Sequence, residues 1–117
     1  MASPTLRGSS IGTGLSRTSP AGTIVGDLVI VVNWERNGAG SATHTLVNGY
    51  TSIFNQALDD GSEDGQFSVG YQVATVAGAQ TYQSHTSSDG AETWSGLLAV
   101  VKGFNIATLA PGGPPVL

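Results

Sequence analysis

The stretch Leu28-Val-Ile-Val-Val-Asn-Trp34 decides the fold class, because it opens with five consecutive apolar residues, three of which are valine. β-branched side chains at this density favour an extended strand. The turn-forming pairs Gly26-Asp27 before it and Asn37-Gly38 after it limit the run to the length of one strand. A run without a polar break also predicts that this strand is covered on both faces.

Further strands are predicted on the C-terminal side of this stretch. Residues 67–73 alternate between apolar and polar side chains with a period of two, which is typical of a strand with one buried face. Residues 97–101 form a second apolar run. No stretch predicts a helix, and the spacing of the strands predicts an all-β fold with a single antiparallel β-sandwich. The expected strands are 28–34, 50–57 (half-buried), 67–73, 80–86 and 94–104.

The two ends of the chain differ in composition from its middle. Residues 1–22 are rich in Ser, Thr, Gly and Pro, so we expect a flexible, extended N-terminal arm. The part from Leu6 to Ile11 could add an edge strand once the arm has docked. Residues 107–117 predict an extended, Pro/Gly-rich C-terminal tail. The β-sandwich domain is therefore expected at residues 23–106.

Charge is sparse and unevenly placed. Only 10% of the residues are charged, and the formal net charge is −4. Residues 1–26 contain Arg7 and Arg17 without any acid, whereas the rest holds all eight acids against two basic residues. Binding a nucleic acid backbone requires several contacts between Lys or Arg and phosphates, and four basic residues are too few for that. We therefore expect no nucleic acid partner. The apolar runs are far shorter than a membrane-spanning helix, so we expect no membrane partner.

The acidic stretch at residues 59–65 is the best candidate for a metal site. Asp60, Ser62 and Asp64 occupy the first, third and fifth positions of a calcium-binding loop, and Gly65 occupies the sixth. The acid expected at the twelfth position is replaced by Tyr71, and no flanking helix is predicted. A solvated acidic turn is the preferred interpretation, with calcium as the weaker alternative. No cofactor is expected.

No group in the sequence predicts catalysis. His44 and His85 lie in polar surroundings without a partner at metal-ligand spacing, and we expect both at the surface or in turns. Asp27 and Glu92 could pair as in a glycosidase, but Asp27 follows a glycine in a turn and is interpreted as structural. The chain has no Cys and no Gly-x-Ser-x-Gly motif. We therefore expect a protein that is not an enzyme.

Several segments resemble a small β-domain of tailed-bacteriophage virion proteins. In the segment Ser19-Pro-Ala-Gly-Thr-Ile-Val-Gly-Asp-Leu-Val-Ile-Val-Val32, a Pro-x-Gly and a Gly-Asp-Leu element precede a long apolar strand. Gly49-Tyr50, Tyr71-Gln-Val-Ala-Thr75 and Trp94-Ser-Gly-Leu-Leu-Ala-Val-Val-Lys-Gly-Phe104 then follow in the order of that family. The resemblance covers about residues 19–105. The chain departs from it at Tyr50, where the family often carries Trp, and in the acidic insert.

The resemblance implies a jelly-roll-like sandwich in a virion and carries over no catalytic residue. We expect a capsid decoration (cement) protein on the outer surface of the capsid, because the sequence contains no long shaft or attachment region. The expected partners are the major capsid protein and further copies of the chain in a homotrimer. In this hypothesis the arm clamps several capsid subunits as it becomes ordered. The arm residues expected to bind the capsid are Leu6, Arg7, Ile11, Leu15 and Arg17.

The alternative is a domain of a tail or fibre that binds host-surface carbohydrate. Such a domain needs exposed aromatic side chains near Asp or Asn at one edge. The loop at residues 36–45 carries Arg36, Asn37 and His44 but no aromatic residue, which counts against this alternative. The aromatic residues in the predicted strands are instead expected in the core. They are Trp34, Tyr50, Phe54, Tyr71, Tyr82 and Trp94.

Overall fold

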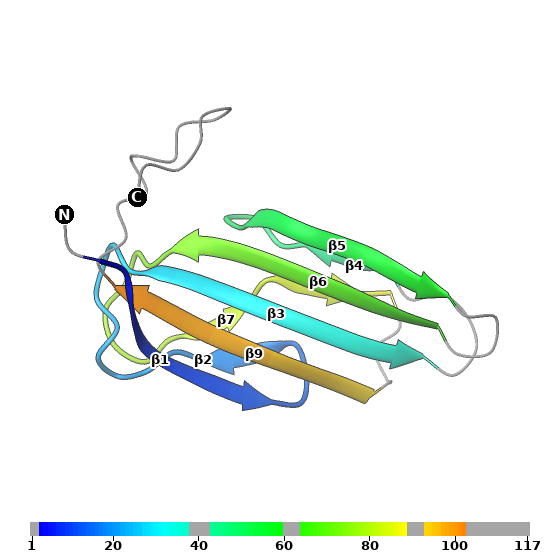
Figure 1. Cartoon of the computed structure of the whole chain (residues 1–117), viewed down its shortest axis with the longest axis horizontal. Helices are drawn as coiled ribbons and strands as arrows, with labels where there is room; N and C mark the ends of the chain where they lie inside the picture. The colour runs from blue at the N-terminus through cyan, green and yellow to red at the C-terminus, as the bar shows by residue number, and fades with distance from the viewer. Residues whose placement is uncertain (1–2, 38–42, 60–63, 89–92, 103–117) are drawn as a thin grey trace.

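Figure 1 shows the computed structural model, which describes residues 3–37, 43–59, 64–88 and 93–102. Every regular element in these residues is a β-strand, so the predicted all-β fold is confirmed. They include no helix that is long and apolar enough to cross a membrane. The strands are β1 (Thr5–Gly12), β2 (Ser16–Thr18), β3 (Leu28–Asn37), β4 (His44–Leu46), β5 (Thr51–Asp59), β6 (Asp64–Val73), β7 (Thr81–Gln83), β8 (His85–Ser87) and β9 (Thr93–Lys102).

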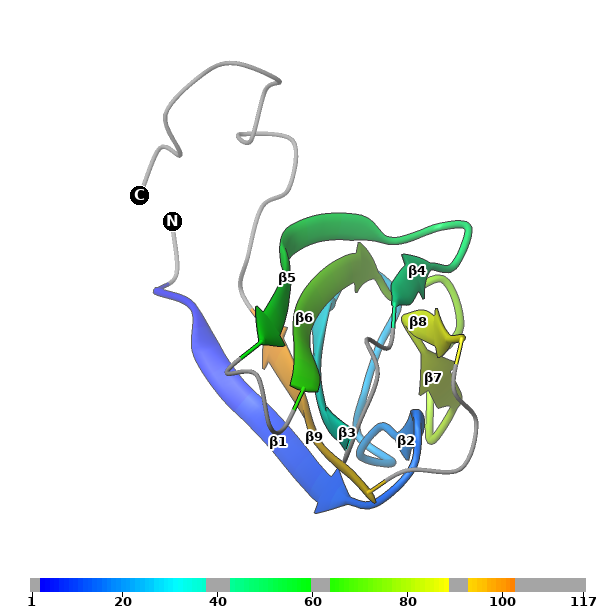
Figure 2. The ribbon, with the colours of Figure 1, turned by 90° about the vertical axis from the view of Figure 1, so that its right-hand side faces the viewer.

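The largest element is a five-stranded antiparallel sheet in the order β1-β9-β3-β6-β5. Its central strand, β3, pairs with β6 on one side and with β9 on the other. Two small sheets, β2-β7 and β4-β8, lie together on one side of the large sheet (Figure 2). The fold is therefore a β-sandwich in which one layer is continuous and the other is split. We call the side of the large sheet toward the small sheets the inner face, and the opposite side the outer face.

The apolar core lies on one half of the inner face. Val29 and Val31 of β3 stand beside Leu98 and Val100 of β9, and none of the four has any exposed surface. Tyr82 of β7 covers them from the second layer, and Ala74 and the half-buried Tyr50 complete the cluster. Burying these branched side chains provides the main hydrophobic stabilisation of the sandwich.

The strand predicted at residues 28–34 is present as part of β3, but the prediction that both its faces are covered was wrong. Val29 and Val31 are buried, whereas Ile30 and Val32 are only half-buried and Trp34 is 37% exposed. Successive side chains of a strand point to opposite faces, and the described second layer covers only one of them. An uninterrupted apolar run therefore provides both a core and an apolar surface.

Two other strands differ from the prediction in which face is buried. The period of two over residues 67–73 is present in β6, but the polar Gln66 and Ser68 are buried while Phe67 and Val69 are half-buried. The expected half-buried strand at 50–57 is β5, which is an edge strand and is exposed on both faces through Leu58. Of the small sheets, β4 contacts β5, and the Asn55 amide donates to the backbone carbonyl of His44 at 2.9 Å, but this contact leaves the side chains of β5 exposed.

The edge strand expected between Leu6 and Ile11 is present, because β1 lies at the edge of the large sheet. Residues 5–12 form β1, which pairs with β9 along the edge of the large sheet, and residues 16–18 form β2, which pairs with β7. β1 contains few apolar residues, but its backbone hydrogen bonds to β9 hold it in the sheet. Composition alone does not reveal such pairing. Residues 5–18 are thus docked on the strands of the expected domain, and the boundary at residue 22 stays a prediction. The expected tail, 107–117, lies outside the described residues.

Candidate functional site

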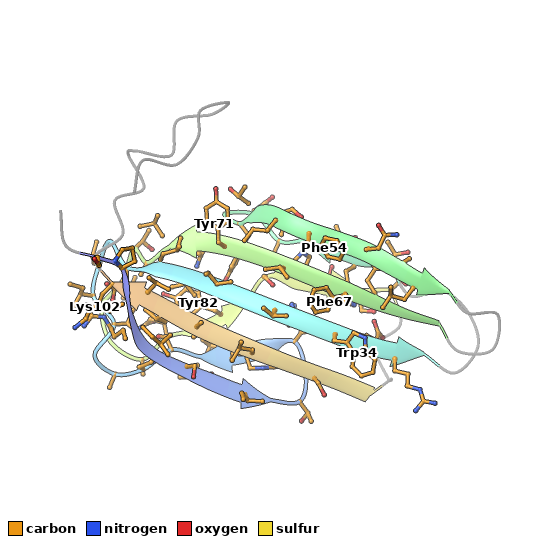
Figure 3. The ribbon with its side chains drawn as sticks, viewed as in Figure 1. Trp34, Phe54, Phe67, Tyr71, Tyr82 and Lys102 are labelled. Carbon is orange, nitrogen blue, oxygen red and sulfur yellow. The ribbon has the colours of Figure 1, made fainter. Side chains whose placement is uncertain are left out.

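The outer face of the large sheet is the first candidate site, and its central positions are apolar. Its three central strands alternate so that every second residue points away from the core, as Trp34 and Phe67 do in Figure 3. No described element covers these side chains (Figure 2). The apolar residues of the outer face are Leu6, Ile11, Ile30, Val32, Trp34, Phe54, Phe67, Val69, Tyr71, Leu97, Ala99 and Val101.

Cross-strand register brings these side chains into one continuous patch. Val32 lies directly between Val69 of β6 and Leu97 of β9. The rings of Phe54 and Phe67 meet edge to face, with centroids 5.6 Å apart. Phe54 is still 45% exposed, which is unusual for an aromatic residue with a packed neighbour. The patch is therefore ordered by the sheet itself while remaining open on its outer side.

The outer face is large for a domain of this size. Five strands spaced by about 4.8 Å, with about eight residues each at about 3.4 Å, give a footprint of roughly 650 Å². The largest apolar patch of a typical monomer covers about 300–600 Å², and such patches commonly mark an interaction site. The outer face can therefore bind a flat apolar surface of another protein.

A cluster of buried polar side chains on the inner face is the second candidate site. Strands of the large sheet contribute Asn33, Glu35 and Ser68, and the small sheets contribute His44, Ser84, His85 and Ser87. All of them are buried except Ser87, which is half-buried. The prediction that both histidines lie at the surface or in turns was therefore wrong. A core that is polar on one half needs every group to be paired, because an unpaired buried polar group costs about 1–3 kcal/mol.

His44 connects a serine to a carboxylate within this cluster. Its Nε2 donates to Glu35 Oε2 at 3.0 Å, which leaves Nδ1 to accept the hydroxyl of Ser68 at 2.8 Å. Ser87 Oγ donates to the same Glu35 oxygen at 2.9 Å. Burial lowers the pKa of His44 to about 4. A neutral imidazole between one donor and one acceptor fits this arrangement.

Ser68, His44 and Glu35 have the connectivity of a Ser-His-Glu catalytic triad, but not its accessibility. A catalytic serine must reach a substrate carbonyl, whereas Ser68 and Glu35 have no exposed surface and His44 has almost none. The serine is also bonded to Nδ1, where the chymotrypsin-type triad uses Nε2. The chemistry available to this enclosed arrangement is therefore hydrogen bonding between the two layers of the sandwich.

A second hydrogen-bonded chain runs beside the first. Asn33 donates to Ser84 Oγ at 2.9 Å, and Ser84 Oγ donates to Nδ1 of His85 at 2.8 Å. Nε2 of His85 is buried, and no described residue forms a hydrogen bond with it. Burial, followed by the charge of His44, lowers the pKa of His85 to about 4. Gly70 lies under this histidine, since a Cβ there would come within 3.3 Å of its ring.

The arm residues predicted to bind a capsid are placed very differently from one another. Leu6 and Ile11 are 61% and 82% exposed and belong to the outer face, and Leu15 is half-buried. Arg7 forms an ion pair with Asp27, with Nε 2.5 Å from Oδ2. Burial alone would raise the pKa of Asp27, but hydrogen bonds from Arg7 and the backbone of Ile24 lower it overall. Asp27 is thus structural, as interpreted from the sequence, and it fixes β1 to the turn before β3.

Arg17 is excluded from the surface, since only 4% of it is exposed. One terminal nitrogen donates to the backbone carbonyls of Thr13, Gly14 and Ser16. The guanidinium lies against Gly96 of β9, where any Cβ would collide with it. A buried arginine that closes its own turn cannot reach a capsid subunit, so its predicted binding role is withdrawn.

The weak calcium candidate falls mostly outside the described residues. Asp60 and Ser62 are not described, and Asp64 is the first residue of β6. Among the described residues, no three His, Cys, Asp or Glu side chains are close enough together to hold a metal ion.

Comparison with family models, curated proteins and solved structures gives no match for this chain. Its function is therefore argued from its own residues.

Sequence reasoning missed Glu35, the centre of the buried cluster. A signal was present, because Asn33 and Glu35 continue the inward period of two set by Val29 and Val31. Glu35 was overlooked because polar residues are usually expected to point outward. The outer face was overlooked because its aromatic residues were expected to lie in the core.

Proposed function

We propose that this chain is a non-enzymatic structural protein of a virion, a capsid decoration protein that binds the outer surface of a phage head. The observation that carries the proposal is the outer face, a patch of twelve apolar side chains on a rigid sheet that lacks a described covering layer. A large exposed apolar surface of this kind commonly marks a site where another protein binds. A component of an assembly has such a site.

The enclosed polar cluster supports the non-enzymatic part of the proposal. Its serine and carboxylate have no exposed surface, so the hydrogen-bonded groups that most resemble a catalytic site cannot meet a substrate. The resemblance of residues 19–105 to phage virion domains supports the location. The proposed partners are the major capsid protein and other copies of this chain, for which the resemblance implies a homotrimer.

Co-sedimentation with undecorated phage capsids tests the proposal. We expect saturable binding at a fixed ratio to capsid subunits, compared with a sample without capsids. A capsid-free pellet, or binding that never saturates, would reject a decoration role.

A second candidate function is recognition of host-surface carbohydrate by a tail or fibre domain. A cleft of about 250 Å³ lies between β7 and the end of β6, and its described lining carries no charged side chain. Tyr rings and Gln amides suit the apolar face and hydroxyl groups of a sugar. The lining residues are Tyr50, Gln72, Thr75, Val76, Gln80, Thr81, Tyr82 and Gln83. Retention on immobilised host polysaccharide that Gln83→Ala abolishes would favour this function over decoration.

A further inference from the structure

We infer that the outer face binds the outer face of a second copy of this chain, so that two large sheets pack together in a two-fold dimer. This inference rests on the proposed function, which already names other copies of the chain as partners; it assigns the outer face to such a copy, so that the capsid protein contacts other surfaces of the dimer. It departs from the trimer that the resemblance implies.

The charges of the molecule favour a second copy on this face. Two copies that each carry a formal charge of −4 repel one another, so close approach is easiest through a surface without acids. None of the outer-face side chains that the structure describes is an acid, and the charged residue among them is the basic Arg36. Of the buried acids, Glu35 points to the inner face and Asp27 is paired with Arg7. The outer face is therefore the place where like-charged copies can meet.

The size of the face also fits a dimer. A stable protein interface buries about 800 Å² per partner. The flat footprint of roughly 650 Å² underestimates the accessible surface, because the ridges of side chains add to it. Sheets pack face to face at about 10 Å, with their strands within about 30° of one another or nearly perpendicular. A second large sheet thus covers the whole patch at once.

The composition of the patch resembles the centre of an interface. Its middle row contains Val32, Val69 and Leu97, and aromatic residues lie beside this row. Polar residues such as Ser9, Gln56 and Ser95 occupy outer-face positions toward its border. An apolar centre with a polar rim is the usual anatomy of a protein interface. Because the same face occurs on both copies, the contact closes with two subunits.

Sedimentation velocity of the full chain over a range of micromolar concentrations tests the inference. The monomer has a mass of 11.8 kDa, and we expect the wild-type protein to sediment as a species of twice that mass. Val32→Glu places an unpaired charge at the centre of the patch and should weaken the dimer about a hundredfold or more. Val25→Glu is the matched control, because Val25 is 62% exposed in the turn before β3, outside the patch. This control should remain dimeric.

A cysteine variant keeps the test decisive even where Val32→Glu affects folding. The chain has no Cys, so a single introduced thiol reports one position. Val32 lies in the middle of the central strand, and the two copies of a Val32→Cys variant lie near the two-fold axis. Sheets packed about 10 Å apart hold the two Cα atoms too far apart for a disulfide. We therefore expect a short thiol-reactive cross-linker, applied at low protein concentration, to give a covalent dimer from Val32→Cys and much less from Val25→Cys.

The outcomes separate this inference from the proposed function. A monomer at every concentration, a trimer, or equal dimerisation of Val32→Glu and Val25→Glu would overturn the inference. A monomeric wild-type protein that binds capsids, and loses that binding through Val32→Glu, would assign the face to the capsid protein and keep the decoration role. A dimer that fails to bind capsids would keep the inference and reject the decoration role.

Discussion

The two faces of the five-stranded sheet are formed by the same strands, but the inner face buries polar side chains whereas the outer face exposes apolar ones. The inner face buries Glu35 and His44 in paired hydrogen bonds, whereas the outer face leaves Trp34 and Phe54 partly in water. On β6 the contrast is sharpest, since buried Ser68 stands between the half-buried Phe67 and Val69. Burial in this fold follows the position of the second layer rather than the polarity of the side chain.

The inner face stabilises the fold, whereas the outer face is available for contacts with other molecules. The inner face combines an apolar half with a polar half that is cross-linked by hydrogen bonds between the layers. The outer face contributes cross-strand contacts to the sheet, but its side chains are available to a partner. Substitutions on the two faces should therefore affect different measurements.

The largest effect is expected from neighbouring residues on opposite faces. Val31→Asp places a charge in the apolar core and should cost about 4 kcal/mol or more, enough to unfold a protein of ordinary stability. Val32→Asp faces outward and should leave the fold intact with a modest loss. Thermal unfolding followed by circular dichroism distinguishes them. Equal loss in both variants would mean that the outer face is covered within the monomer.

Glu35→Ala should be the next most damaging change. It removes the oxygen that accepts hydrogen bonds from His44 and Ser87. The loss of these two buried hydrogen bonds should lower the free energy of unfolding by about 2–4 kcal/mol. Glu35→Gln keeps an acceptor oxygen and should cost less. Urea denaturation measures both values. If the two variants lose the same stability, the carboxylate is not the organising group of the polar cluster.

Acid should weaken the polar half of the inner face selectively. The pKa of His85 falls from 6.5 to about 4 on folding, so the unfolded chain binds more protons between these values. Stability therefore falls as the pH drops from 6.5 toward 4, by about 1.4 kcal/mol per unit for each such histidine. Urea midpoints across this range measure the slope. A His85→Gln variant should have a shallower slope, and an unchanged slope would assign the effect to other groups.

The smallest effect is expected at the edge of the sheet. Arg7→Ala removes a partly exposed ion pair and should cost about 1 kcal/mol, mainly by loosening β1. Hydrogen exchange of the β1 amides should rise, while that of β3 stays unchanged. Added salt should reduce the difference between variant and wild type. Unaltered protection of β1 would show that its pairing with β9 suffices.

The sequence predicted the strands well because local composition controls them. The apolar run in β3, the alternation in β6 and the run in β9 each indicated a strand that is present, and the sandwich follows from their spacing. The faces could not be predicted in the same way. Which side of β6 is buried depends on where β4 and β8 pack, and no local pattern encodes that choice.

The candidate sites were predicted less well for related reasons. Arg7 and Arg17 appeared free for binding because they are distant in sequence from their contacts, Asp27 and Gly96. His44 appeared isolated because its partners, Glu35 and Ser68, come from two different strands. The period of two could have identified Glu35 as buried, but only a three-dimensional arrangement identifies the histidine that accompanies it.

The pairing of β1 with β9 has a consequence for how the molecule is made. These strands lie side by side, although nearly the whole described chain separates them in sequence. During synthesis β1 therefore leaves the ribosome long before its partner exists, and β3 can at first pair only with β6. Native contacts of such long range slow folding, because loop closure precedes the gain from pairing. The nascent chain consequently displays an unpaired edge of β3 until β9 is complete, and protection of that edge during synthesis is a requirement built into this strand order.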